Sequence, residues 1–390
     1  MIEKAWRGSS RYWIFVISLL VIIGVAFGAY LYQYNHGLTV TGLSRDVSWG
    51  LYIAQLTFLV GVAASAVMVV LPYYLHNVKV FGRITVLGEF LAVTAILMCM
   101  LFVFVDLGKP LRLMNIMLYP TPNSILFWDV IALSGYLFLN ILIGWTAVNA
   151  ERKQVKPPNW AMALVYISIP WAVSIHTVTA FLYAGLPGRH LWMTAIMAAR
   201  FLSSAFSSGP AIVIVLALIL RRYTKFDAGQ EAIQKLSLIV LYALIINMFF
   251  LGLEFFTTFY SQIPHHMVYF QYLYLGLHGH ANLAPWMWAS GIMCIAAILI
   301  LLFPANRRND GLLGATCVML FIGLWIDKGL GLVSGGFIPN PLHHVTEYFP
   351  TAPEIMITVG IWALGALILT VFYKVAIFVK EETGGGLAPH

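Results

Sequence analysis

The feature that most constrains the fold is a series of ten apolar segments, each about 20 or more residues long. A helix needs about 20 apolar residues to cross a hydrocarbon layer about 30 Å thick. None of the segments shows the alternation of apolar and polar residues that marks the strands of a membrane barrel. Because lipid offers the backbone no hydrogen bonds, spanning segments of this kind must be helical. The sequence therefore predicts an all-α polytopic membrane bundle with spans at about 12–34, 49–75, 84–105, 124–148, 160–184, 192–220, 233–260, 283–303, 312–332 and 355–379.

Composition excludes a soluble enzyme. Hydrophobic residues make up 61% of the 390 residues and charged residues only 9%, whereas soluble domains carry about 25% charged residues. A soluble protein could not hide so much apolar side chain, because its outer shell must face water. The segments between the spans are also too short to form a soluble domain. Soluble catalytic machinery would therefore have to come from partner subunits.

The distribution of Lys and Arg predicts the orientation, because these residues are retained on the cytoplasmic side. With the N-terminus inside, sixteen of the 22 Lys and Arg lie in cytoplasmic segments and only Arg45, Lys109, Arg112 and Arg189 lie outside. Both termini are therefore predicted to be cytoplasmic, in a multi-pass protein of the cytoplasmic membrane. The net charge of +7 follows from these loop residues. It does not indicate nucleic-acid binding, because charges beside membrane helices contact lipid headgroups.

The chain is predicted to form one integral membrane domain over residues 1–390. Within it we expect a core bundle at about 49–184, a second bundle at about 192–380 and a disordered tail at 381–390. The sixth span combines four serines with Pro210. Because proline lacks an amide donor and clashes with the preceding turn, a kink is expected there.

The metal-binding residues do not form a recognisable cofactor motif. The three cysteines lie in separate spans without a CxxC pair, whereas an Fe–S cluster usually needs four thiolates. A CxxCH haem attachment site is also missing. His176 alone among the histidines lies well inside a span, so a haem between facing helices is not favoured. The prediction is a subunit without an Fe–S cluster or haem.

A first set of polar residues converges in the outer half of spans two to five. Ionisable groups at this depth are costly and point to function. A quinone suits them, because its tail stays in lipid while its carbonyl oxygens need hydrogen-bond donors. Quinol oxidation also needs proton acceptors, for which histidine and carboxylates are natural. The predicted quinone site comprises Gln55, Asp106, Asp129 and His176, with the neighbouring Trp49 and Trp128; Lys109 and Arg112 lie just above, as a predicted partner surface.

A second set of charged residues lies mainly in spans six to ten. Arg200 and Glu254 lie at comparable predicted depths, so they could form an ion pair that only holds helices together. The alternative is a proton or ion path. The predicted proton pathway comprises Glu89, Arg200, Glu254, Lys328 and Glu354.

Several motifs resemble the NrfD/PsrC (polysulfide reductase membrane subunit) family. They are WGLYI at 49–53, DLGKP at 106–110, Trp128-Asp129 and PWAVSIHT at 170–177. EFFTTFY at 254–260 and YFPTAPE at 348–354 resemble the longer, ten-span branch, and the whole pattern is most similar to its DsrP-type members from the sulfite-reduction-associated Dsr complex. The chain departs from some relatives in the fifth span, where Phe181-Leu182-Tyr183 stands in place of an Asp-containing stretch.

The resemblance implies a subunit that binds menaquinone or menaquinol and has no activity alone. It would exchange electrons with an extracytoplasmic ferredoxin-like Fe–S subunit. By analogy the complex would also contain a cytochrome b, a multihaem cytochrome c and a heterodisulfide-reductase-like subunit. The residues by themselves leave two alternatives open, a secondary transporter, which ten spans with an interrupted helix would suit, and a b-type cytochrome membrane subunit.

Overall fold

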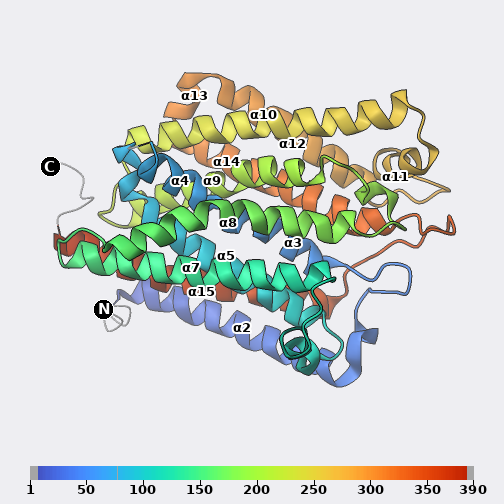
Figure 1. Ribbon diagram of the computed structural model, residues 1–390, viewed down its shortest axis with the longest axis horizontal. Helices are drawn as coiled ribbons and strands as arrows, with labels where there is room; N and C mark the ends of the chain where they lie inside the picture. Colours follow the sequence, from blue (N-terminus) through green and yellow to red (C-terminus); the bar gives the residue numbers. More distant parts are fainter. Residues whose placement is uncertain (1–7, 77, 384–390) are drawn as a thin grey trace.

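The computed structural model describes residues 8–76 and 78–383 as a bundle of roughly antiparallel helices (Figure 1). The long helices are α2 (Ser10–His36), α3 (Leu51–Ala63), α4 (Ser65–Tyr74), α5 (Thr85–Asp106), α7 (Ile125–Arg152), α8 (Asn159–Ala184), α9 (Met197–Tyr223), α10 (Gln230–Tyr260), α12 (Ala284–Leu302), α14 (Asp310–Trp325) and α15 (Ala352–Thr383). Shorter elements are α6 (Asn115–Leu118), α11 (Pro264–Tyr274), α13 (Pro304–Arg308), the 3-10 turns η1 (Gly37–Val40), η2 (Lys79–Arg83), η3 (Pro110–Met114), η4 (His190–Trp192) and η6 (Gly335–Phe337), and the π-helical segment η5 (Ile326–Ser334).

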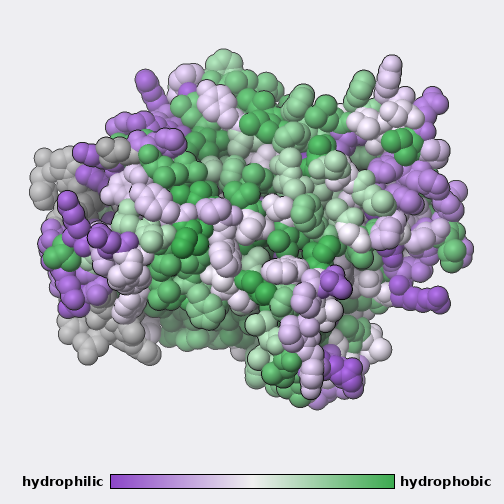
Figure 2. All heavy atoms as spheres, in the orientation of Figure 1, coloured by the Kyte–Doolittle hydropathy of each residue, from purple (hydrophilic) through white to green (hydrophobic). Residues whose placement is uncertain are grey.

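Ten segments of the described chain are long and apolar enough to cross a membrane, which confirms the predicted fold class. α3 and α4 together form the second, and α14, η5 and η6 form the ninth. Figure 2 shows a broad hydrophobic surface between two hydrophilic ends of the molecule. α2 begins and α15 ends at the same end of the bundle, at the left of Figure 1, which we call the terminal face. The opposite end is called the far face.

The helix breaks lie in the second and ninth spans, where the sequence does not predict them. α9 continues through Pro210 without a break and begins at Met197 rather than near Trp192, which lies in η4. Three serines of this helix bond back to carbonyls of their own helix, such as Ser207 Oγ to Ser203 O at 3.0 Å. The interruptions occur instead at Ala64, between α3 and α4, and in η5.

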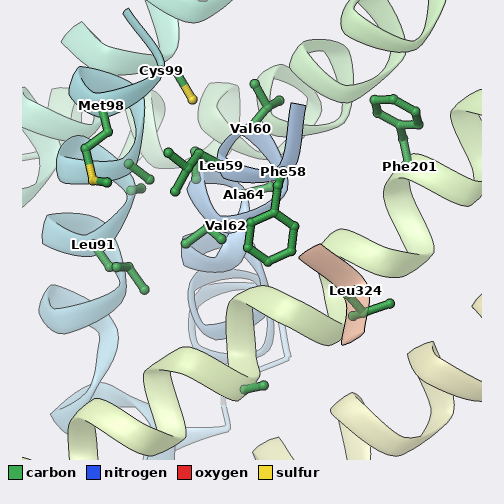
Figure 3. Packing of buried hydrophobic residues seen from close by; sticks show 14 of the residues in the cluster. Phe58, Leu59, Val60, Val62, Ala64, Leu91, Met98, Cys99, Phe201 and Leu324 are labelled. Carbon is green, nitrogen blue, oxygen red and sulfur yellow. The ribbon is translucent and has the colours of Figure 1, made fainter. Parts of the chain in front are cut away.

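α3 forms the centre of the molecule. Every residue from Leu51 to Ala63 is buried, and the helix packs against α5, α9 and η5. Figure 3 shows Phe58, Leu59 and Val60 of this helix among side chains of its neighbours. Small residues allow the close approach, because a Cβ added to Gly61 would lie 3.5 Å from Ala205. Small residues at helix interfaces are the usual basis of association in lipid, where there is no hydrophobic driving force.

The last helix joins the two halves of the chain. The sequence-based division assigns α15 to the second bundle, yet α15 packs against α2 and α5, and the phenol of Tyr373 donates a 2.8 Å hydrogen bond to Leu87 O. The predicted disordered tail also begins too early, because α15 runs to Thr383; its remainder, 384–390, lies outside the described residues.

Candidate functional site

One buried face of α8 carries the central polar residues of the candidate site. His176, Thr179 and Tyr183 recur at the spacing that places side chains on one side of a helix, and all three are buried. The ring of His176 lies with Nδ1 2.9 Å from Ala172 O, one turn earlier. A carbonyl can only accept, so Nδ1 carries the proton, and in the neutral ring Nε2 is then an acceptor. Nε2 is buried and has no hydrogen-bond partner among the described residues.

Neighbouring helices contribute the partners of this face. Thr179 Oγ1 lies 2.7 Å from Asp129 Oδ1 of α7 and 2.8 Å from Ile175 O. Tyr183 forms a short hydrogen bond with Thr57 of α3. The structure thus brings Asp129 and His176 of the predicted quinone site to the same interface between α7, α8 and α3.

Aromatic rings close this interface on its far-face side. Trp49 stacks on Trp192 with ring centroids 5.8 Å apart, and its ring meets Tyr183 and Phe337 edge-on at 5.5 and 5.8 Å. The Trp192 indole donates a 2.8 Å bond to Leu332 O. Trp49 was predicted here. Trp192, Tyr183 and Phe337 were missed because aromatic residues near span ends usually serve as interfacial anchors.

Two predicted residues have other neighbours. Gln55 Oε1 accepts hydrogen bonds from the indoles of Trp325 (3.1 Å) and Trp362 (3.0 Å), so it ties α3 to α14 and α15. Trp128 is half exposed, and its indole donates to Pro122 O at 2.8 Å. Neither contact brings these side chains to His176.

Asp106 ends α5 beside a separate hydrogen-bond chain. The Tyr52 phenol donates to Gln33 Oε1, and Gln33 Nε2 donates to Val105 O, each at 2.7 Å. Asp106 Oδ1 is buried without a partner among the described residues. A small cavity of about 10 Å³ lies between α2 and the segment that follows α5, bordered by Gln33 and by Leu107, the residue after Asp106.

Glu354 is the most completely hydrogen-bonded of the predicted proton-pathway residues. Its carboxylate accepts from Gly42 N (2.7 Å), the Tyr348 phenol (2.7 Å) and Thr351 N (2.8 Å). Because Thr351 precedes the first residue of α15 and Glu354 is its third, the backbone contact is the reciprocal half of a capping box. Tyr348 in turn accepts from Leu51 N at 2.8 Å. Glu354 therefore joins the beginnings of α3 and α15 to the segment around Gly42.

A buried ionic cluster forms in the second half of the chain. The guanidinium of Arg200 contacts Glu254 of α10, which is the pair considered from the sequence, and also Asp327 of η5 at 3.2 Å. A cavity of about 20 Å³ lies beside Arg200 and Asp327. The next residue, Lys328, is buried with its ammonium 3.8 Å from the ring centroid of Phe201.

Glu89 is isolated from both groups. It lies near the start of α5, 17 residues before Asp106, which corresponds to about 25 Å along the helix. Its side chain is buried, and neither carboxyl oxygen has a hydrogen-bond partner among the described residues. A Cβ added to Gly144 of α7 would lie 3.4 Å from Oε2. The absence of a side chain at Gly144 thus makes room for this carboxyl.

The far face carries exposed residues that could contact another protein. Lys109 and Arg112 are exposed, as are Leu111 and Met114 of the same segment. Two titratable groups in other segments of the far face respond to their surroundings. Hydrogen bonds from Asn340 and Thr346 hold the pKa of Asp46 below its ordinary value. Burial, together with His265 and His343, lowers the pKa of His190.

The residues around His176 fit a quinone in chemistry but leave little free space. The buried Nε2 acceptor and the Asp129–Thr179 pair could hydrogen-bond a quinol hydroxyl. The cavities described above have room for about one water molecule each, and the larger lies beside Arg200 rather than beside His176. Both cavities are smaller than a quinone ring, and neither borders His176.

Comparison with known proteins identifies the family of this chain. The profile of the family described as "Polysulphide reductase, NrfD" matches residues 39–330. The chain is 26% identical to a putative dimethyl sulfoxide reductase membrane subunit of Halobacterium salinarum, covering 92% of this chain and 89% of the relative. It is 24% identical to a selenate reductase subunit of Mesobacillus selenatarsenatis, with 94% of each covered. It is also 26% identical to the "Hdr-like menaquinol oxidoreductase integral membrane subunit" of Archaeoglobus fulgidus, with 97% of each covered. The chain belongs to the NrfD polysulphide reductase family.

Proposed function

We propose that this chain is the quinone-reactive integral membrane subunit of a multi-subunit respiratory redox complex. It oxidises menaquinol, or reduces menaquinone, and exchanges electrons with an extracytoplasmic partner subunit. The observation that carries the proposal is the buried, unpartnered Nε2 of His176 beside the Asp129–Thr179 pair. The relatives' names, which include a menaquinol oxidoreductase subunit, favour this function over a transporter or a b-type cytochrome.

The chain's own groups would handle the protons of the reaction. Oxidation of menaquinol releases two electrons and two protons. His176 Nε2 would accept the hydrogen bond and then the proton of one hydroxyl, since a neutral imidazole is a suitable base near neutral pH. The Asp129 carboxylate, oriented by Thr179, would serve the other. Trp49 and Tyr183 would form part of the wall that keeps water from this interface.

The electrons would leave through a partner at the far face. We assign the exposed Lys109 and Arg112 to the docking surface of a ferredoxin-like Fe–S subunit. A cytochrome b, a multihaem cytochrome c and a heterodisulfide-reductase-like subunit remain predictions by analogy, as does membership in the DsrP-type branch. The lack of an Fe–S cluster and of haem in this subunit is likewise a prediction.

The remaining charged residues would form the proton pathway. Arg200, Glu254 and Lys328 lie close together and suit this role. Glu89 could exchange protons nearer the terminal face, because its buried carboxyl lacks a partner in the described chain. Glu354 is the weakest member, since its hydrogen bonds suffice to explain its burial.

Replacement of His176 by leucine tests the site. Loss of this hydrogen-bond partner costs about 1–3 kcal/mol, which corresponds to oxidation of a menaquinol analogue by the intact complex that is about 5-fold to 140-fold slower. His36→Leu is the matched control, because His36 bonds Tyr32 O one turn earlier in the same way but is exposed on α2. The control should oxidise the analogue like the parent. A His176→Leu complex with parental rates would show that the site is wrong.

A further inference from the structure

One cationic side chain at the terminal face has no partner in the described chain. Arg307 of α13 is only 9% exposed. Its Nε is buried without a hydrogen-bond partner among the described residues, and the ion pairs of these residues do not include it. A buried guanidinium without a counter-ion loses hydration that the described chain does not replace. An anion from outside the chain would supply the missing partner.

The acidic residues at the adjoining helix ends are engaged by other cations. Asp227, just before α10, and Asp310, at the start of α14, both bind Arg221, with N–O distances of 2.8 and 2.7 Å. Glu231 binds Lys235 at 2.8 Å within α10. The two arginines that end α13 therefore keep a positive charge that the described chain does not neutralise.

Arg307 is held at the boundary between the hydrophobic surface and the terminal face. Gln234 Nε2 of α10 donates a 2.6 Å hydrogen bond to Arg307 O, which ties the backbone of α13 to α10. Figure 1 shows α13 beside α10, toward the terminal face. α13 begins directly after the tenth-to-last residues of no loop but after Phe303, and both Phe303 and Leu302, the last residue of α12, are exposed. Exposed apolar side chains at the end of a spanning helix contact acyl chains, so the guanidinium lies at the depth of the lipid headgroups.

We propose that Arg307 binds the phosphate group of an anionic phospholipid in the leaflet at the terminal face. The terminal nitrogens of its guanidinium are not among the buried unpartnered atoms, so they can donate hydrogen bonds to phosphate oxygens, which the planar fork of arginine suits. The acyl chains of the lipid would lie over Leu302 and Phe303. An anionic lipid is favoured over a zwitterionic one, because Arg308 adds a second charge to the same site. The site lies outside the proposed quinone chemistry and goes beyond the proposed function.

Thermal unfolding of the purified complex in a neutral detergent tests the site. Short-chain phosphatidylglycerol should raise the thermal midpoint of the parent, because a ligand that binds only the folded state stabilises it. Phosphatidylcholine should raise it less. Arg307→Gln removes the charge and the fork, so its apparent affinity for phosphatidylglycerol should fall by about tenfold or more. A parental response to phosphatidylglycerol in Arg307→Gln would overturn the proposal.

A second arginine of the terminal face provides the matched control. Arg222, in the last turn of α9, is exposed, and Arg222→Gln removes the same charge. Loss of a surface charge should weaken phosphatidylglycerol binding by about fivefold at most. Equal losses in the two variants would show diffuse attraction and overturn the site. If Arg307→Gln does not assemble, Arg307→Lys replaces it; lysine keeps the charge but loses the fork, so weaker binding than in the parent is still expected, and parental binding would contradict the site.

Inorganic phosphate identifies the source of the phosphate group. It should leave the midpoint of the parent unchanged, because it brings no acyl chains to Leu302 and Phe303. A shift as large as that with phosphatidylglycerol would assign the site to a soluble phosphate and overturn the lipid. If neither probe shifts the midpoint of the parent, a partner subunit covers Arg307 instead, and the proposal is wrong.

Discussion

Buried polar side chains fall into two classes in this protein, and their hydrogen bonds distinguish them. Gln55 and Glu354 have several partners each, so their burial costs little and stabilises the packing of helices. His176 Nε2 and both oxygens of Glu89 have none among the described residues. A buried polar group without a partner costs about 1–3 kcal/mol. We infer that the second class is retained for chemistry rather than for stability.

Glu354→Gln is expected to destabilise the protein without changing its proton chemistry. The amide would place a donor among three donors, so at least one hydrogen bond to a charged acceptor is lost, at about 1.5–3 kcal/mol. The thermal midpoint of the complex should fall, while the pH profile of quinol oxidation stays unchanged. Glu231→Gln is the control, because Glu231 is exposed and its partner among the described residues is Lys235 on the same helix. If the thermal midpoint of Glu354→Gln is unchanged and its proton uptake is altered, Glu354 belongs to the proton pathway after all.

Arg200 has a second acidic partner, Asp327, and this reduces the loss of stability expected when Glu254 alone is replaced. In Glu254→Gln, Arg200 keeps Asp327 at 3.2 Å, so the loss of stability should stay below the cost of breaking a lone buried pair. Glu254→Gln with Asp327→Asn leaves the guanidinium unpaired and should cost about 3–5 kcal/mol. Adding Arg200→Met should recover most of this loss. Thermal or denaturant unfolding of the complex measures each step.

A different result would assign Glu254 a role in proton transfer. If Glu254 carries protons, Glu254→Gln should leave assembly and quinone binding intact and alter proton uptake or its pH dependence. If the Glu254→Gln complex instead matches the parent in turnover, proton balance and stability, both the structural and the functional role of Glu254 are contradicted.

At the scale of elements, η5 decides how the ninth span contributes to the site. Its residues Asp327 and Lys328 face α9, and Trp325, just before it, reaches Gln55 of α3. The following turn, η6, brings Gly336 against Trp192 so closely that an added Cβ would lie 2.1 Å from the indole nitrogen. The aromatic cluster and the ionic cluster therefore depend on the same segment.

Gly336→Ala should disturb this segment. The new methyl group would displace the Trp192 indole from Leu332 O, and overpacking of this kind typically costs about 1–3 kcal/mol. We expect a lower thermal midpoint and slower quinol oxidation. Gly291→Ala on α12 is the control, since a Cβ there meets no atom within 4 Å; it should be neutral or slightly stabilising, because alanine favours helix over glycine by about 0.5–1 kcal/mol. Equal midpoints for both variants would contradict the assigned contact.

At the scale of the whole molecule, the distribution of hydrophobic and charged residues predicts which end of the protein faces the cytoplasm. The hydrophobic surface in Figure 2 separates two hydrophilic ends. The described residues at the terminal face include the basic positions of η2, the C-terminal ends of α7 and α9, and α13. By the tendency of Lys and Arg to stay inside, this face is predicted to be cytoplasmic.

A reporter fused after His390 tests this orientation. An even number of spans places both ends of the chain on one side, so a reporter active only in the cytoplasm should be active there, and one active only outside should be silent. The matching fusion within the segment between α5 and α7 should give the reverse pattern. Activity outside for the C-terminal fusion would invert the assignment of the far face and of the proposed partner surface.

The sequence by itself determined the class of the protein, the ten spans and their approximate ends, because the length and apolarity of a spanning helix are local properties that lipid imposes. It also placed Asp129 and His176 at similar depths, since depth follows from position along a helix. It could not determine the direction in which a side chain points around the helix axis. Gln55 therefore proved to bond two indoles, Trp128 to face outward and Glu354 to cap α15. Only the tertiary structure decided these contacts, together with the π-helical turn that sets Lys328 over Phe201 and Asp327 against Arg200. Both depend on how distant helices pack, and packing is a property of the whole bundle.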